Sequence, residues 1–154
     1  MAAAISEREL QTVRSFLEVT STLALATVNA DGSAQIAPLF FVADAALNLY
    51  WLSAPTSIHS VNLSARPAVA AAVYPEVWAW EQIRGVQIEG QAGAVNDSEA
   101  SAAALRLYRA KFTLPAALNA QIAASTVYKL TPRWLRWLDN GVRFGYKAQG
   151  EINT

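Results

Sequence analysis

The only histidine of this 154-residue chain lies in a stretch rich in hydroxyl groups, APTSIHSVNL at residues 54–63. His59 follows Thr56 and Ser57 and is followed directly by Ser60. A helix that begins here would present unpaired N–H groups and partial positive charge, which suit a phosphate. The same residues suit a simpler interpretation, because Thr56 or Ser57 could serve only as a helix N-cap. The stretch alone therefore leaves an anion site and a capped helix both open.

Elsewhere the chain offers few groups that could carry out chemistry unaided. The absence of cysteine excludes a thiolate nucleophile, and a single histidine argues against an imidazole-based metal centre, so we expect no metal site. Neither a P-loop nor GxGxxG is present. Arg84 precedes a glycine and could either reach an anion or be an ordinary exposed strand residue, whereas Asp139 in an Asp-Asn-Gly turn needs no chemistry to explain it. An enzymatic reaction would therefore depend on a bound cofactor.

The composition is typical of a globular protein. It is 53% hydrophobic and 16% charged, which excludes disorder, and part of the apolar surface could be covered by a second copy. The 12 basic and 12 acidic residues leave no net charge, which argues against a nucleic-acid partner. The N-terminus lacks the pattern of a signal peptide, and no run approaches the ~20 apolar residues that span a bilayer. We expect a single domain over residues 1–154, cytoplasmic and without membrane contact.

Hydrophobic periodicity predicts a small antiparallel barrel with peripheral helices. Ser6 and Glu9 form a capping box that opens a helix over about residues 6–20. A three-stranded antiparallel meander follows within residues 22–53, with Pro38 on an edge or at a bulge. The remaining elements are a short helix at 57–64, a strand at 68–74, a glycine-bearing strand within 83–95, helices opened by Asn96 and over 114–124, and one or two final strands with a hairpin at 139–141.

The predicted strand AVAAAVY at residues 68–74 consists mostly of alanines, whose side chains are small. Such a strand leaves room for a ligand or another element to lie close to the backbone.

Several motifs then occur in a characteristic order. LALATVNADGSAQIAPLFFV opens the series, Ser57–Leu63 is followed by Arg-Pro-Ala-Val-Ala at 66–70, and Val86–Gly90 reads VQIEG. Together with VYKL these motifs resemble the flavin-binding split barrels related to pyridoxamine 5′-phosphate oxidase, over nearly the whole chain. The tail WLDNGVRFGYK is similar to that of a small bacterial branch of these barrels. The resemblance implies a mainly β, α+β fold: a six-stranded antiparallel split β-barrel with peripheral helices.

The resemblance also implies a homodimeric flavoprotein in which FMN lies between the two chains. Ser57 and His59 would hold its phosphate, helped by Thr56, while Arg84 and Gln87 would contact the phosphate, the ribityl chain or the ring edge. Backbone and apolar contacts along the isoalloxazine would come from Ala37, Pro38, Leu39, Trp51, Leu52 and Ser53. Arg143, Phe144 and Lys147 would approach the flavin from the partner chain.

The chain departs from the family pattern in two places. Ile58, His59 and Gln87 stand where many relatives have Arg or Lys, so the phosphate pocket carries less positive charge. The C-terminal Trp-Arg-Leu segment of true pyridoxamine phosphate oxidases is not reproduced. The resemblance therefore favours an FMN-dependent oxidoreductase that acts on another small molecule with NAD(P)H or a different reductant. A non-catalytic flavin carrier or sensor, a haem-handling split barrel and a deazaflavin-binding protein stay open as alternatives.

Overall fold

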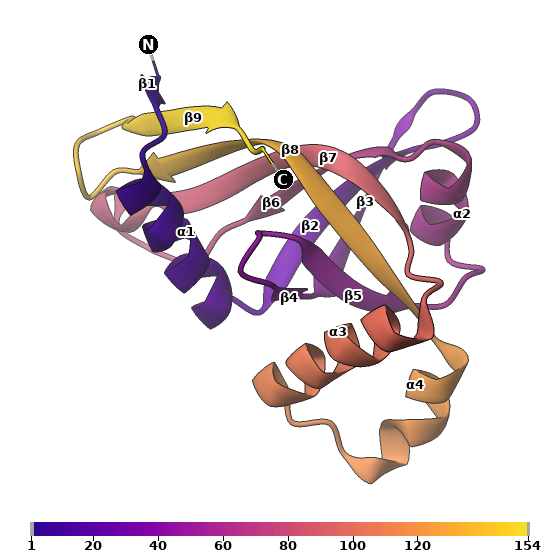
Figure 1. The fold of residues 1–154 in the computed structure, drawn as a ribbon. Helices are drawn as coiled ribbons and strands as arrows, with labels where there is room; N and C mark the ends of the chain where they lie inside the picture. The colour runs from indigo at the N-terminus through magenta and orange to yellow at the C-terminus, as the bar shows by residue number, and fades with distance from the viewer. Residues whose placement is uncertain (1, 154) are drawn as a thin grey trace.

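A computed structural model describes residues 2–153, and within them one curved sheet of nine strands forms the centre of the molecule (Figure 1). The strands are β1 (Ala3–Ala4), β2 (Thr22–Val28), β3 (Ala34–Phe40), β4 (Val42–Ala43), β5 (Leu49–Ser53), β6 (Ala68–Val73), β7 (Arg84–Ala94), β8 (Thr126–Asp139) and β9 (Lys147–Glu151). The helices are α1 (Glu7–Val19), α2 (Ile58–Ala65), α3 (Ser98–Lys111) and α4 (Asn119–Ala124), with 3₁₀ turns η1 (Trp80–Gln82) and η2 (Ala116–Leu118).

The strand order is β1-β9-β8-β7-β6-β2-β3, and β5 joins the sheet by pairing with β8 and with β4. β3 pairs only with β2 among the described residues, so the sheet does not close between β3 and β5. This is the predicted split barrel with peripheral helices. The six strands of the prediction correspond to β2, β3, β5, β6, β7 and β8, to which the structure adds β1, β4 and β9; the β1–β9 pair is parallel.

Three local predictions were wrong. β5 does not extend the β2–β3 hairpin into a meander but pairs with β8, because alternation fixes the buried face of a strand and not its neighbour. The N-cap of α3 is Asp97 rather than Asn96, since the Asp97 carboxylate accepts the N–H of Ala100 at 2.8 Å. The segment VRFGYK is mostly a turn, and β9 begins only at Lys147.

The predictions for α1 and α2 agree with the structure. α1 begins after Ser6, and both halves of its capping box with Glu9 are present. α2 ends before Arg66-Pro67, as the proline requires. No helix among residues 2–153 is long and apolar enough to cross a membrane.

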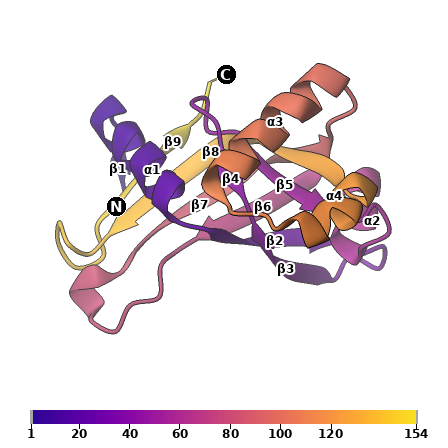
Figure 2. The same cartoon turned by 90° about the horizontal axis from the view of Figure 1, so that it is seen from below.

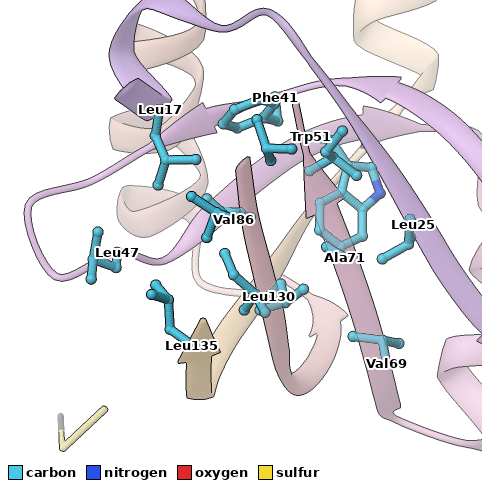
Figure 3. Close-up of a cluster of buried hydrophobic side chains, with 14 of the residues drawn as sticks. Leu17, Leu25, Phe41, Leu47, Trp51, Val69, Ala71, Val86, Leu130 and Leu135 are labelled. Atoms are coloured by element: carbon cyan, nitrogen blue, oxygen red, sulfur yellow. The ribbon is translucent and has the colours of Figure 1, made fainter. Parts of the chain in front are cut away.

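The inward side chains of the barrel strands form the core shown in Figure 3. Leu23 and Leu25 of β2 point inward and alternate with outward alanines, while α1 covers one side through Leu17. Trp51 and Trp137 are buried in this core. At the Glu89/Gly90 bulge of β7 only glycine fits, because a Cβ on Gly90 would collide with the Thr131 carbonyl of β8. The predicted bulge is therefore confirmed.

Candidate functional site

The histidine stretch forms a compact corner where β5 ends and α2 begins. We call Ser53, Thr56, Ser57 and His59 the α2 corner. His59 Nε2 lies 2.8 Å from Ser53 Oγ and 3.1 Å from Ser57 Oγ. Ser57 is the N-cap of α2, since its Oγ accepts the N–H of Ser60 at 3.4 Å. The capping role of Ser57 is thus confirmed, and an additional role in anion binding stays a prediction.

The environment of His59 favours the neutral imidazole. Burial lowers the pKa of His59 below its ordinary value, because desolvation penalises the charged ring. The ring nitrogen Nε2 is already engaged with two hydroxyls, one of them on the buried Ser53. His59 therefore contributes a dipole and hydrogen bonds to the α2 corner at neutral pH, not a positive charge.

A buried asparagine, missed in the sequence analysis, holds α2 in place. Asn62 Nδ2 donates to Thr27 Oγ1 at 3.1 Å and to Asn29 Oδ1 at 2.8 Å, which ties the helix to the β2–β3 hairpin. Arg66 Nε donates to the Val28 carbonyl at 2.7 Å and ties the end of the helix to the same hairpin. The sequence could have indicated this contact, because Asn62 is a polar residue on the apolar face of a short helix and Thr27 is an inward polar residue on β2.

The residues predicted to line the isoalloxazine ring lie on two strands beside the α2 corner, β3 and β5. Ala37, Pro38 and Leu39 belong to the edge strand β3, which α2 contacts; the edge position predicted for Pro38 is confirmed. Because β3 has one unpaired edge, its backbone can hydrogen-bond to a ligand on that side. The indole of Trp51 is completely buried, so only the backbone of Trp51 could face such a ligand.

A second group of predicted residues lies at the other end of the barrel. Arg84 begins β7 and pairs with Asp139, while Lys147 begins β9. The opposite end of β7, at Ala94, pairs with Tyr128 of β8, which pairs in turn with Trp51 of β5. This end lies about 30 Å from Arg84 at 3.3 Å per strand residue. Figures 1 and 2 show α2 and the β8–β9 turn at opposite ends of the sheet. Arg84, Arg143, Phe144 and Lys147 therefore do not reach the α2 corner of their own chain.

Between the two ends lies a shallow face floored by small side chains. We call the outward residues Ala24, Ala26, Ala70 and Ala72 of β2 and β6 the alanine face. A groove of about 410 Å³ runs over it, with Gln87 of β7 on one wall. This volume falls within the range of about 300–1,000 Å³ that ligand pockets occupy.

Arg136 and Trp134 of β8, neither predicted as a site residue, complete that wall. Arg136 Nη1 donates to Gln87 Oε1 at 3.3 Å, and its guanidinium lies 5.0 Å from the centre of the Trp134 ring. A neighbouring groove of about 370 Å³ shares part of the alanine face. The room predicted from AVAAAVY is present, on the outer side of the sheet.

The α2 corner offers hydrogen-bond donors of the kind that bind a phosphate, but its side chains carry no positive charge to neutralise one. The first turn of α2 presents backbone N–H groups, and the exposed Thr56 adds a hydroxyl. No cluster of three His, Cys, Asp or Glu residues that could hold a metal occurs in the part of the chain that the structure describes. The corner is thus suited to an anion whose charge is neutralised from elsewhere.

Sequence comparison places this fold in a known family. A model of the pyridoxamine 5′-phosphate oxidase family matches residues 10–139. The chain belongs to this family. No curated protein matches it at a significant level.

Solved structures of this family share the fold at low sequence identity. The heme binding protein from Mycobacterium smegmatis is 18% identical, with a TM-score of 0.77 over 96% of this chain and 60% of that one. HutZ, the heme storage protein from Vibrio cholerae, is 22% identical, with a TM-score of 0.68 over 86% of this chain and 91% of that one. An F420 reductase is 24% identical, with a TM-score of 0.61 over 79% of this chain and 94% of that one. Two of these proteins are named for haem and one for F420, so the shared fold alone does not fix the cofactor.

Proposed function

We propose that two copies of this family member bind FMN non-covalently at their interface and form an oxidoreductase for a small molecule, with NAD(P)H or another reductant as electron donor. The observation that carries the proposal is the α2 corner beside the unpaired edge of β3. A helix N-terminus suits the phosphate, and a strand edge suits the polar rim of a flat ring. Bound FMN would supply the two-electron chemistry, for which the chain itself has no evident nucleophile or acid–base pair.

The alanine face supports the pairing of two copies. Small side chains let a second sheet approach closely, and the large apolar side chain of Ile36, 67% exposed, lines the groove over this face. Stable interfaces bury about 800 Å² per partner, with apolar residues at the centre. A second copy packed here would cover both the face and the open edge of β3.

Each part of the α2 corner has a defined task in this proposal. The first turn of α2 and Thr56 bind the phosphate. Ser57 and His59 also contact the phosphate while their mutual hydrogen bond holds that turn in shape, and Asn62 fixes the helix against β2. The backbone of β3 orients the ring, and the second copy excludes water from it.

The absorbance spectrum of the purified protein tests the cofactor directly. Bound FMN gives a band at about 450 nm, whereas haem gives a Soret band at about 400 nm and would establish the haem-handling alternative. Reconstitution with FMN, haem and the deazaflavin F420 in parallel shows which ligand binds most tightly. Tighter binding of either rival would contradict the FMN assignment.

Two further measurements test the site and the activity. Ser57→Ala should weaken FMN binding by a few-fold, since a lost cap costs about 1 kcal/mol, while Ser98→Ala on the exposed start of α3 should leave it unchanged. Mixing the FMN-loaded protein with NADH or NADPH should bleach the flavin within seconds. A loaded protein that no reductant bleaches would be a carrier or sensor instead.

A further inference from the structure

A cleft between α1 and α3 lies apart from the α2 corner and the alanine face. Its floor is β4, which contacts both helices and lies between them in Figure 2. The β4–β5 turn, residues 44–48, forms one wall, so the cleft lies at the start of β5 whereas the α2 corner lies at its end. We call this space the α1–α3 cleft. Its volume of about 550 Å³ is that of a ligand pocket.

Arg14 of α1 lines this cleft and keeps one of its nitrogens free. Its Nε donates to the Ala45 carbonyl at 3.0 Å, and its Nη1 donates to Glu7 Oε1 at 2.8 Å. The side chain is 29% exposed, and Nη2 donates to no group within residues 2–153. The guanidinium is therefore held in one orientation, in which Nη2 can donate to a ligand.

Lys111 of α3 adds a second cation to the lining of the cleft. Its Nζ donates to the carbonyls of Leu17 and Thr20 at 2.9 and 2.6 Å and lies 4.1 Å from the centre of the Phe41 ring. Burial lowers the pKa of Lys111 to about 8, because desolvation penalises the ammonium. At neutral pH the side chain keeps its charge, and an anion beside it would offset part of this desolvation.

The carboxylates near the cleft limit the charge of the ligand that it can hold. Asp44 is already engaged, since it accepts four hydrogen bonds from its own turn and from Tyr50. Glu7 takes only Nη1 of Arg14 and leaves Nη2 free. Glu18 lines the cleft, is exposed and makes no ion pair within residues 2–153. Because its negative charge opposes charge on an anion, the cleft suits a monoanion and disfavours a dianion.

The remaining walls of the cleft are apolar. Val42 and Ala43 form the floor, and Leu107 and Ala110 form the α3 side. Leu107 is 40% exposed, so an alkyl chain or a ring in the cleft would remove part of its side chain from water. Apolar walls with a few polar groups that fix the orientation of the ligand are typical of small-molecule sites.

We infer that the α1–α3 cleft is a second ligand site, which binds a small monocarboxylic acid with an apolar body. The carboxylate accepts a hydrogen bond from Arg14 Nη2 and lies beside the ammonium of Lys111, while the apolar body packs on β4 and Leu107. Charge-assisted hydrogen bonds from a guanidinium to a carboxylate are about twice as strong as neutral ones. The cleft shares no lining residue with the α2 corner or the alanine face, so this site does not depend on the proposed flavin site.

Calorimetric titration of the full chain with octanoate at neutral pH tests this site. Octanoate should saturate a single site on each chain. Three other probes vary the chemistry: acetate lacks the apolar body, octylamine carries the opposite charge, and octyl phosphate carries up to two negative charges. Each should bind at least about tenfold more weakly than octanoate, a difference of about 1.4 kcal/mol.

Substitutions then locate the ligand. Arg14→Gln should weaken octanoate binding about tenfold or more. Arg8→Gln removes an exposed arginine from another face of α1 and should change the affinity by less than about twofold. Ala110→Trp places an indole in the cleft from an exposed position on α3, so it should abolish binding without disturbing the core.

Unchanged octanoate affinity in Ala110→Trp would overturn the inference, and this variant decides the matter even if Arg14→Gln fails to fold. Tighter binding of octylamine or octyl phosphate, or a titration without saturable binding, would overturn it as well. So would displacement of octanoate by FMN, because octanoate would then occupy the proposed flavin site. Failure of the protein to bind FMN would refute the proposed function and leave the octanoate result intact.

Discussion

Replacing His59 with alanine separates two roles that the α2 corner allows for this side chain. The imidazole could contact the phosphate itself, or it could only hold Ser53 and Ser57 in position. Both roles predict a loss of stability, because Nε2 makes hydrogen bonds of 2.8 and 3.1 Å to these serines. Only direct contact predicts a large loss of FMN affinity that exceeds the effect of removing Ser53.

The magnitudes follow from the contacts. Two neutral hydrogen bonds contribute about 0.5–1.5 kcal/mol each, so the free energy of unfolding should fall by about 1–3 kcal/mol. For a chain of this length that lowers Tm by about 2–12 °C. A contact to phosphate is worth about 1.5–3 kcal/mol, so direct contact predicts at least about tenfold weaker FMN binding in His59→Ala.

Ser53→Ala is the matched control, because it removes the buried partner of the imidazole and leaves the proposed phosphate-binding residues Thr56, Ser57 and His59 in place. FMN titrations and thermal melts of wild type, both single variants and the double variant give the coupling energy of the pair. We expect His59→Ala to lose about tenfold in affinity and Ser53→Ala less than about threefold. An FMN affinity of His59→Ala within twofold of wild type would remove His59 from the site and leave it a purely structural role.

Wild type and His59→Ala also report on the protonation of His59. Burial lowers the pKa of His59, so the unfolded chain binds the proton more readily than the folded one. Wild-type stability should therefore fall as the pH drops below the ordinary histidine pKa of about 6.5, and His59→Ala should lack this component. If the imidazole also meets a bound phosphate, FMN should bind wild type more tightly as the pH falls, and the variant should show no such gain.

Three other substitutions test the scaffold. Gly90→Ala should lower the free energy of unfolding by about 2 kcal/mol or more in urea titrations, because the added Cβ meets the Thr131 carbonyl of β8. Lys111→Ala removes the ammonium that donates to two carbonyls at the end of α1, at 2.9 and 2.6 Å, and should cost about 1–3 kcal/mol in the same assay. Since burial lowers the pKa of Lys111 to about 8, wild type should gain stability relative to this variant as the pH rises from about 8 towards 10. Ala70→Leu on the alanine face should raise the dimer dissociation constant about tenfold or more in sedimentation experiments with unchanged circular dichroism; an unaltered constant would place the interface elsewhere.

The sequence predicted the helices and strands of this fold better than it predicted which strands pair with each other. Caps and periodicity depend on residues a few positions apart, so the capping box at Ser6 and the limits of α2 could be predicted from local patterns. The pairing of β5 with β8 depends on how the whole sheet curves, and alternation in β5 is the same whichever strand lies beside it. The turn at VRFGYK was predicted as a strand because its aromatic residues have strand propensity, although here Phe144 projects from a turn into solvent and Tyr146 packs against the edge of the core.

The sequence likewise predicted where the candidate site lies but not how its side chains are arranged. The hydroxyl groups around His59 marked the α2 corner, but no pattern in the sequence indicated that the imidazole would turn towards Ser53 and stay neutral. The contribution of Arg136 to the groove was not foreseen, because its outward position is fixed by its register with Gln87 on β7. The spacing of residues predicts which side chains share a strand, whereas a binding wall joins strands that lie far apart in the chain.

The distribution of charge connects cofactor binding to pairing. One chain offers the phosphate a helix N-terminus and hydroxyls, and it keeps its exposed cations Arg84, Arg143 and Lys147 about 30 Å away along β7. If those cations come from the second copy, a single chain has no complete site, and FMN binds the pair more tightly than it binds the monomer. By thermodynamic linkage, the cofactor must then strengthen pairing by the same factor by which pairing strengthens cofactor binding. A neutral histidine at the α2 corner is therefore compatible with an anion site, because in this arrangement the second copy supplies the positive charge.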